Sequence, residues 1–268
     1  MTVPAPSTLQ ARDLSLAYGE RRVVEDLSLH VPTGKVTIIV GPNACGKSTL
    51  LRGLARLLPA SSGAVLLDGA SIHSTPSREV ARRLGILPQG PVAPDGITVS
   101  DLVSRGRHPH QGYFRRWSGD DEAAVAAALT ATDTLDLAPR AVDELSGGQR
   151  QRVWIAMALA QRTGILLLDE PTTYLDVSHQ VEVLDLLTDL NQTEGTTVVM
   201  VLHELNLACR YADHLVVMSG GAVAAAGEPG DVLTEQVVED VFAMPCRVIP
   251  DPVSNTPLIV PIGRHRIG

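Results

Sequence analysis

The sequence is poor in aromatic residues, in cysteine and in long apolar runs. Aromatic residues make up 3% of the 268 positions, so Leu, Val, Ile and Ala have to fill most of any buried core. The three cysteines, Cys45, Cys209 and Cys246, are too few and too scattered for a disulfide framework or a metal cluster, which fits a reducing cytosol. No run of about 18 apolar residues occurs, so we expect the chain not to span a bilayer by itself.

The sequence also lacks an excess of basic residues. It has 22 Lys and Arg against 30 Asp and Glu, and its formal net charge is −8. Proteins that bind duplex nucleic acids place many cations against the phosphates, so we expect no nucleic acid as a main partner. The opening MTVPAPSTLQ has neither a basic start nor an apolar stretch, which predicts that no secretory signal is removed.

What the sequence does contain is an alternation of strand and helix patterns. Apolar and polar residues alternate on both sides of YGERR (18–22), which predicts an antiparallel hairpin near the N-terminus. The segments VTIIV (36–40), ILLL (165–168) and TVVMVL (197–202) are continuously apolar, as in parallel strands that are covered on both faces. Each leads into a helical pattern, so these segments predict a doubly wound α/β core.

Sequence patterns typical of helices dominate the middle of the chain and occur again near its end. Residues from about 96 to 163 read mostly as helix, including the alanine-rich DDEAAVAAALTATD (120–133), and predict an inserted helical subdomain. Leucines at helical spacing after residue 49 predict a helix that Pro59 stops. Strands and one helix are expected at about 214–262. We expect a single domain over 1–268.

GPNACGKS (41–48) fits the phosphate-loop pattern GxxxxGK[ST], and it lies where that loop requires, between an apolar strand and a helix. Glycines at 41 and 46 permit backbone turns that aim N–H groups inward as an anion nest. Lys47 would reach the terminal phosphates, and the Ser48 hydroxyl can bind Mg²⁺. The strand and helix on either side make accidental glycines the weaker alternative.

Two acids end the apolar strand ILLLDEP (165–171). Asp169 would contact Mg²⁺ directly or through a water ligand, and Glu170 could orient and deprotonate the water that attacks the γ-phosphate. The alternative is an acidic turn at a strand end, which is common by itself. The phosphate loop makes that alternative the weaker one.

Three further residues are candidates on weaker grounds. His203 follows the strand TVVMVL at the carboxyl edge where ligands bind in α/β sheets, and could hold the γ-phosphate or the water. Gln89 could sense Mg²⁺ or the water, although a lone glutamine in a loop is unremarkable. Tyr18 could stack on adenine, and a tyrosine packed within its hairpin is an equally good interpretation.

LSGGQRQR (145–152) provides a second anion-binding helix head, because the first turn of a helix leaves backbone N–H groups without partners. No second lysine-bearing nucleotide pocket accompanies it. Ser146, Gly147 and Gly148 therefore form a half-site that needs a partner. Two copies related by a two-fold axis would each offer this head to the γ-phosphate held by the other, so ATP would close the dimer.

The chain resembles the ATP-binding subunits of ABC transporters over roughly residues 8–262. The motifs that carry the resemblance are Walker A (Gly41 to Ser48), the Q-loop (Gln89), LSGGQ (Leu145 to Gln149), Walker B (Ile165 to Glu170), the D-loop (Leu175–Asp176) and the H-loop (His203). The resemblance implies an α/β fold with a P-loop NTPase parallel sheet core, an N-terminal antiparallel β subdomain and the inserted helical subdomain. It also implies that Tyr18 stacks on adenine and that Asp176 lies at the dimer interface.

The resulting site predictions fall into three groups. We expect Glu170, His203, Lys47 and Gln89 to serve catalysis, and Ser48, Gln89 and Asp169 to serve Mg²⁺. The residues expected to contact ATP are Tyr18, Gly41, Pro42, Asn43, Ala44, Cys45, Gly46, Lys47, Ser48, Thr49, Ser146, Gly147, Gly148, Gln149 and Asp176.

Three longer segments resemble the importers of ferric siderophores, with haem and cobalamin importers close behind: RGRHPHQGYFRRWS (105–118), PTTYLDVSHQVEVLDLL (171–187) and HELNLACRYADHLV (203–216). Ala44 and Glu204 depart from the subfamily, which often has Gly and Asp there. The resemblance implies a peripheral homodimer at the cytoplasmic face of the inner membrane, two permease subunits and, indirectly, an extracytoplasmic siderophore-binding protein. A soluble ABC ATPase without a membrane partner is the alternative.

The segment 105–118 concentrates four arginines, two histidines and three aromatic residues. Exposed aromatic residues beside arginines are enriched in interfaces, so we expect this segment to face the cytoplasmic loops of the permease. A solvated basic loop is the alternative.

Overall fold

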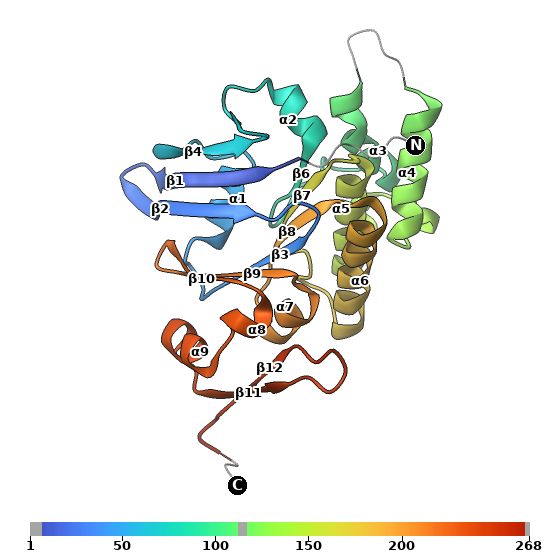
Figure 1. The fold of residues 1–268 in the computed structure, drawn as a ribbon. Coiled ribbons are helices and arrows are strands. Elements are labelled where there is room, and N and C mark those ends of the chain that lie inside the picture. Colours follow the sequence, from blue (N-terminus) through green and yellow to red (C-terminus); the bar gives the residue numbers. More distant parts are fainter. Residues whose placement is uncertain (1–6, 112–116, 266–268) are drawn as a thin grey trace. The chain divides into compact units, whose positions relative to one another are not determined.

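The computed structural model describes residues 7–111 and 117–265, and the chain divides into two compact units. The first unit is built mainly from Ser74–Val198, and the second from Thr8–His73 and the chain from Val199 onward (Figure 1). Strand β8 (Thr197–Val201) contains the point at which the chain passes from one unit to the other. The predicted extents of the domain and its subdomains stay predictions.

The second unit begins with the expected antiparallel hairpin. Strands β1 (Leu9–Tyr18) and β2 (Arg21–Val31) pair from Leu9↔Val31 to Tyr18↔Arg21, and the turn is shorter than YGERR. Strand β4 (Ser62–Leu67) pairs with β1 on its other side, and β5 (Ala70–Ser71) extends this sheet. Leucines of β1 and β2 are buried because alternate side chains share one face of a sheet.

Strand β3 (Val36–Val40) is buried at every position, as its continuous apolar sequence predicts. It pairs in parallel with β9 (His214–Ser219), which pairs antiparallel with β10 (Ala222–Gly227). The Leu202 N–H, just after β8, donates to the Ile39 carbonyl of β3 at 3.2 Å. The phosphate-loop segment directly follows this buried strand.

Helix α1 (Lys47–Leu54) is shorter than predicted, because it ends five residues before Pro59. Arg56 has a φ of 63°, which no α-helix accommodates, and Leu57 is 58% exposed. The N–H groups of Leu57 and Leu58 both donate to the Arg52 carbonyl, so the chain closes a tight turn there.

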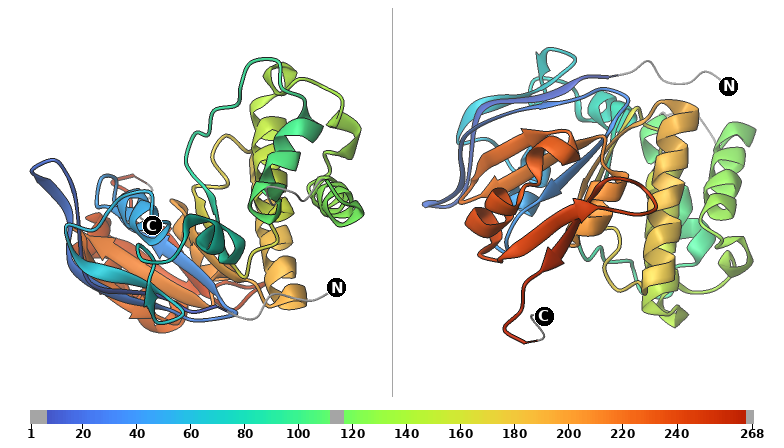
Figure 2. Two further views of the ribbon diagram at one scale, coloured as in Figure 1. Left: turned by 90° about the horizontal axis from the view of Figure 1, so that it is seen from above. Right: turned by 60° about the horizontal axis from the view of Figure 1, so that its bottom comes forward.

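The C-terminal part of the second unit contains three helices and a hairpin (Figure 2). Asn206 holds α7 against the hairpin, because its side chain accepts from the Ile259 N–H at 2.7 Å and donates to the Ile259 carbonyl at 3.3 Å. The short helix α8 was not predicted. The elements are α7 (Leu205–Tyr211), α8 (Pro229–Val232), α9 (Glu235–Phe242), β11 (Cys246–Pro250) and β12 (Pro257–Pro261).

The first unit combines parallel strands with the predicted helical insertion. Strand β6 (Leu84–Leu87) pairs in parallel with the fully buried β7 (Ile165–Asp169). The Thr197 N–H, which opens β8, donates to the Gly164 carbonyl just before β7 at 2.9 Å. The helices are α2 (Ser77–Arg83), α3 (Val99–Ser104), α4 (Gly119–Ala131), α5 (Gly147–Ala160) and α6 (Val177–Glu194), with 3₁₀ turns at Arg105–His110, Leu135–Leu137 and Val142–Glu144.

Part of the segment 105–118 is buried inside the first unit and is not a solvated basic loop. The Arg107 guanidinium is buried, pairs with Asp121 at 3.0 Å and donates to the Ala160 carbonyl at 2.8 Å. Burial raises the pKa of the Asp121 carboxyl, but hydrogen bonds from Ser118 and Arg107 outweigh it and hold that pKa below its usual range. Residues 112–116, which contain two of the three aromatic residues, lie outside the described residues.

Within the described residues, no helix combines the length and apolarity that crossing a membrane requires. The predicted fold class is confirmed, since buried parallel strands, an N-terminal antiparallel sheet and a helical insertion are all present.

Candidate functional site

The phosphate loop, 41–48, has the backbone that its glycines were expected to allow. Gly41 has a φ of 157°, and a Cβ atom there would collide with the Met218 carbonyl oxygen. Gly46 has a φ of 107° and directly precedes α1, and an added Cβ would lie 3.1 Å from the Val23 oxygen. Only glycine fits both positions without strain.

The backbone conformation of Ala44 explains why the subfamily often has glycine at this position. Its φ is 63°, in the left-handed region that costs a residue with a Cβ atom about 1–2 kcal/mol. The side chain is exposed, so the substitution is tolerated sterically and its cost is confined to the backbone.

Lys47 folds back over its own loop. The residue is nearly buried, with 5% exposure, and its ammonium donates to the carbonyls of Gly41 at 2.8 Å and Pro42 at 3.0 Å. No acidic residue lies in the first turn of α1, so the N–H groups and dipole at this helix end favour an anion. The loop can therefore hold a phosphate group.

The structure brings together two of the predicted catalytic residues, Gln89 and Glu170. The Gln89 Nε2 donates to the Glu170 Oε2 at 2.8 Å, and the Thr173 hydroxyl donates to the same oxygen at 3.1 Å. Glu170 also has a φ of 54°, an uncommon backbone conformation that points to a constrained site. Asp169, the last residue of β7, is buried.

Ser146 caps α5 through a reciprocal capping box. Its hydroxyl accepts from the Gln149 N–H at 3.2 Å, and the Gln149 side chain accepts from the Ser146 N–H at 3.1 Å. The glycines at 147 and 148 lie beside Tyr174 and Leu175, since Cβ atoms added to them would be 3.7 Å and 3.3 Å from these two side chains. The α5 head thus packs against the D-loop segment.

Asp176 caps α6 and is largely exposed. Its Oδ1 accepts from the His179 N–H at 3.0 Å, from the Ser178 hydroxyl at 2.9 Å and from the His179 ring at 2.7 Å. The hydrogen bond from the His179 backbone is the largest cause that lowers the pKa of Asp176, and those from the Ser178 and His179 side chains follow. The D-loop carboxylate therefore stays charged near neutral pH.

His203 and Tyr18 are both exposed. His203 lies between β8 and α7, where Glu204 caps the helix by accepting from the Leu207 N–H at 2.6 Å. The Tyr18 side chain is not packed within its hairpin, because Tyr18 is 44% exposed and its hydroxyl accepts from Arg52 at 3.2 Å. Glu204 keeps the capping function that aspartate would serve.

A family model described as ABC transporter matches residues 24–173, more than half of the chain. The chain belongs to the ABC transporter family. As a member of this family it binds ATP and hydrolyses it, and the predicted family is confirmed, while the roles of the individual site residues stay predictions.

Sequence similarity to known transport proteins covers nearly the whole ABC chain. It is 53% identical to the achromobactin transport ATP-binding protein CbrD of Dickeya dadantii, over 97% of both chains. It is 52% identical to the ferric enterobactin transport ATP-binding protein FepC of Escherichia coli, over 96% of this chain and 94% of that protein. A dimeric structure of MJ0796, a bacterial ABC transporter cassette, is 27% identical with a TM-score of 0.74, covering 82% of this chain and 98% of the other.

The predicted ATPase site residues are divided between the two units. The second unit carries Tyr18, the phosphate loop and His203, and the first carries Gln89, Ser146 to Gln149, Asp169, Glu170 and Asp176. No group of three or more His, Cys, Asp or Glu suited to a metal occurs in the described part of the chain.

Sequence analysis missed Thr173 and His179 of this ABC chain. Thr173 shares the Glu170 oxygen with Gln89, and its position three residues after that carboxylate was the available signal. His179 follows the N-cap Asp176 by three residues, the spacing at which a capping carboxylate meets a side chain.

Proposed function

We propose that the chain is the ATP-hydrolysing subunit of an ABC importer for ferric siderophores. It works as a homodimer with two membrane-spanning permease subunits, peripherally at the cytoplasmic face of the cell membrane. An extracytoplasmic siderophore-binding protein delivers the iron chelate to the permease.

The high identity to siderophore transport proteins carries this proposal. CbrD and FepC are 53% and 52% identical to the chain over nearly its whole length, and their names specify achromobactin and ferric enterobactin. Both are named as ATP-binding proteins of transport systems, and partnership with permease subunits follows from such a role.

In the proposed mechanism, the phosphate loop (41–48) and the following Thr49 bind the triphosphate through backbone N–H groups and Lys47, and Tyr18 stacks on adenine. Ser48, Asp169 and Gln89 are the proposed ligands of Mg²⁺, which neutralises phosphate charge when bound. A magnesium ion suits hydroxyl, carboxylate and amide oxygens, and the acid-free first turn of α1 suits the phosphates.

Glu170 is the proposed general base, and Gln89, Thr173 and His203 assist it. A carboxylate that accepts two hydrogen bonds is held in one orientation, which supports its use in aiming a water at the γ-phosphate. The His203 imidazole is proposed to hold the phosphate or the water.

The α5 head, Ser146 to Gln149, is proposed to complete the ATP site of a second copy, with Asp176 at the same interface. Its N–H groups at 147 and 148 have no acceptor within the helix, because they belong to its first turn. The dimeric MJ0796 cassette supports a dimer as the assembled form.

The test is co-purification of the chain with candidate permease subunits, followed by ATPase assays in lipid vesicles with the binding protein. We expect ferric siderophores to stimulate turnover, whereas haemin and cobalamin do not. Stimulation by haemin or cobalamin alone would overturn the substrate, and failure to associate with any permease would favour a soluble ABC ATPase.

A further inference from the structure

The peptide that follows Glu170 is held by a side chain of a neighbouring helix. The Gln151 Nε2 of α5 donates to the Pro171 carbonyl at 2.8 Å. Pro171 is buried and Gln151 is half-buried, so this hydrogen bond is partly shielded from water. The signature helix and the loop after β7 are therefore joined directly beside the proposed general base.

The backbone of Glu170 needs support of this kind. Its φ of 54° lies in the left-handed region, which is unfavourable for a residue with a Cβ atom, and a residue before proline prefers an extended backbone. Such a conformation persists only where the surrounding contacts hold it. The Glu170 carbonyl accepts from the Thr173 N–H at 3.2 Å, a contact within the loop itself. Gln151 adds a contact from a different element.

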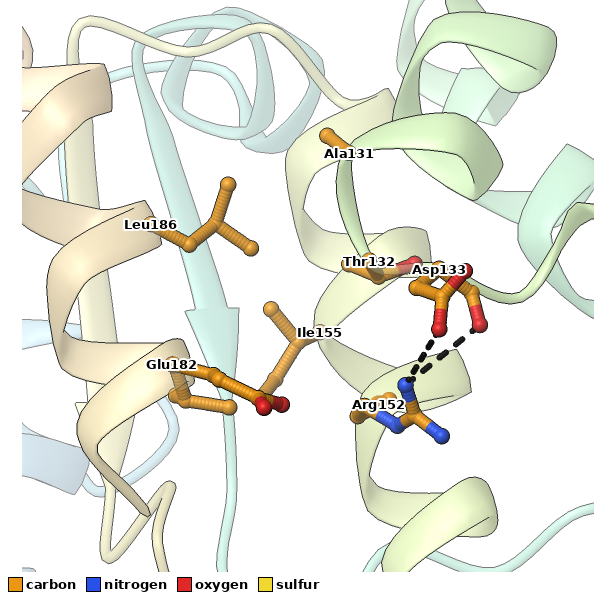
Figure 3. A pocket seen from close by; sticks show the side chains of 8 residues that line it. Ala131, Thr132, Asp133, Arg152, Ile155, Glu182 and Leu186 are labelled. Carbon is orange, nitrogen blue, oxygen red and sulfur yellow. Dashed lines mark hydrogen bonds and ion pairs between the residues drawn. The ribbon is translucent and has the colours of Figure 1, made fainter. Parts of the chain in front are cut away.

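Helix α5 is itself anchored, so it can serve as a fixed support. Its residues 153–156 are buried, and Arg152 pairs with Asp133, just after α4, at 3.2 Å. Figure 3 shows this pair at the edge of the cavity between α4, α5 and α6. Successive residues of an α-helix point about 100° apart. Arg152 and Gln151 therefore tie α5 to two different segments, the end of α4 and the loop after β7.

We propose that Gln151 is a positioning residue for Glu170, an inference that rests on the proposed function. By holding the Pro171 carbonyl, Gln151 fixes the left-handed backbone of Glu170 and thereby the direction of its carboxylate. The hydrogen bonds from Gln89 and Thr173 to Oε2 then fix the rotation of that carboxylate. A catalytic group displaced by about 1 Å can lose about 10²-fold in rate, so one supporting hydrogen bond has a measurable effect.

Gln180 provides a matched comparison within the same loop. Its Nε2 donates from α6 to the Leu175 carbonyl at 3.0 Å. Both glutamines are half-buried and each donates to one backbone carbonyl, so removing either donor should cost comparable stability. They differ in place, because Gln151 holds the peptide next to Glu170 and Gln180 holds the far end of the loop.

The first test is the basal ATPase activity of the purified transporter complex. Gln151→Leu should lower kcat at least tenfold and leave KM for ATP within twofold of wild type, because the phosphate loop is unchanged. Gln151→Glu, which keeps the side-chain volume but removes the donor, should show the same loss. The control Gln180→Leu should keep kcat within threefold, and thermal melts establish that each variant folds. Losses below tenfold in both Gln151 variants, or an equal loss in Gln180→Leu, would overturn the proposal.

A double-mutant cycle with Glu170→Gln then separates positioning from a merely structural role. In the Glu170→Gln complex, Gln151→Leu should lower the residual single-turnover rate less than twofold, because no general base remains to be aimed. An equal loss in both backgrounds would show that Gln151 acts independently of Glu170 and would overturn the proposal.

Failure of this inference is distinguishable from failure of the proposed function. Basal turnover needs no siderophore, so the identity of the transported substrate does not enter the comparison. Near-wild-type turnover of Glu170→Gln would refute the general base itself. Loss of turnover in Glu170→Gln together with full turnover in Gln151→Leu would refute only the positioning role.

Discussion

Replacing Ser146 by aspartate should stop ATP turnover without unfolding the helix that this residue caps. The serine hydroxyl accepts from the Gln149 N–H at 3.2 Å. Asparagine and aspartate are N-caps about as good as serine, so Ser146→Asp and Ser146→Asn should both preserve α5 within about 1 kcal/mol. The two variants differ in one charge.

That charge would lie where the second copy is proposed to bring its triphosphate. Two like charges about 4 Å apart cost roughly 4 kcal/mol at the effective dielectric constant of about 20 found near protein surfaces. This repulsion would lower the equilibrium constant for closing the ATP-bound dimer by nearly a thousandfold. The neutral asparagine adds no charge and therefore no such repulsion. We therefore expect turnover of Ser146→Asp to fall at least a hundredfold and that of Ser146→Asn to stay within about tenfold.

The assay is ATPase activity of the purified transporter complex, accompanied by calorimetric ATP binding to the isolated chain. Both variants should bind ATP as wild type does, because the phosphate loop of the same chain is untouched. Equal turnover of the two variants would refute the role of the α5 head in anion binding. A parallel loss of ATP binding would show that the head acts within one chain.

Four further changes test other parts of the site and fold. Glu170→Gln should reduce turnover by about 10²–10⁴-fold while an ATP-bound dimer accumulates on size exclusion, and near-wild-type turnover would refute the general-base assignment. Lys47→Ala should weaken ATP binding at least tenfold by calorimetry, and unchanged affinity would count against its phosphate role. Ala44→Gly should raise the free energy of unfolding by about 0.5–1 kcal/mol in urea, since it relieves a φ of 63°, and a decrease would contradict the strain argument. Asp121→Asn should lower that free energy by about 3 kcal/mol at pH 7, because it leaves buried Arg107 without its anion. The pKa of Asp121 is lowered in the folded state, so its contribution is present above about pH 4 and should disappear as pH falls through the folded-state pKa; a difference independent of pH would contradict this.

The buried strands could be predicted because their signal is local. Strands β3 and β7 are apolar at nearly every position, and each is followed by a motif that requires a helix or a turn. The end of α1 could not be predicted, because leucines at 57 and 58 continue the helical spacing while the backbone turns at Arg56. Helical periodicity alone does not reveal a left-handed residue.

The role of Arg107 was beyond sequence analysis for a different reason. Its neighbours are basic, so the segment resembles a surface loop, and its partner Asp121 belongs to the following helix. Whether an arginine reaches solvent or a buried carboxylate depends on tertiary packing. His110 shows the same change of role, since its ring contacts the Gln161 carbonyl at 2.7 Å, and burial is the main cause that lowers its pKa.

The candidate site was predictable in its residue types but not in its contacts. Motif spacing singled out Gln89 and Glu170, yet nothing in it required the 2.8 Å hydrogen bond between them or the addition of Thr173. Glu170 also has a left-handed backbone, a conformation that sequence rarely reveals in a residue other than glycine, asparagine or aspartate.

The charges at the helix heads explain why two particular helices should bind phosphate. Among the described helices of eight or more residues, α4 and α9 have acidic residues in their first turns, and α6 has the charged N-cap Asp176. These carboxylates counteract the positive potential of the helix end. Only α1 and α5 begin with neutral caps, Gly46 and Ser146, and have no acid in the first turn. The two heads without acids belong to the phosphate loop and the signature motif, so helix-end electrostatics selects the same two segments as motif spacing does. An acid placed at either head should therefore impair ATP turnover, whereas an acid added to the first turn of α4 should not.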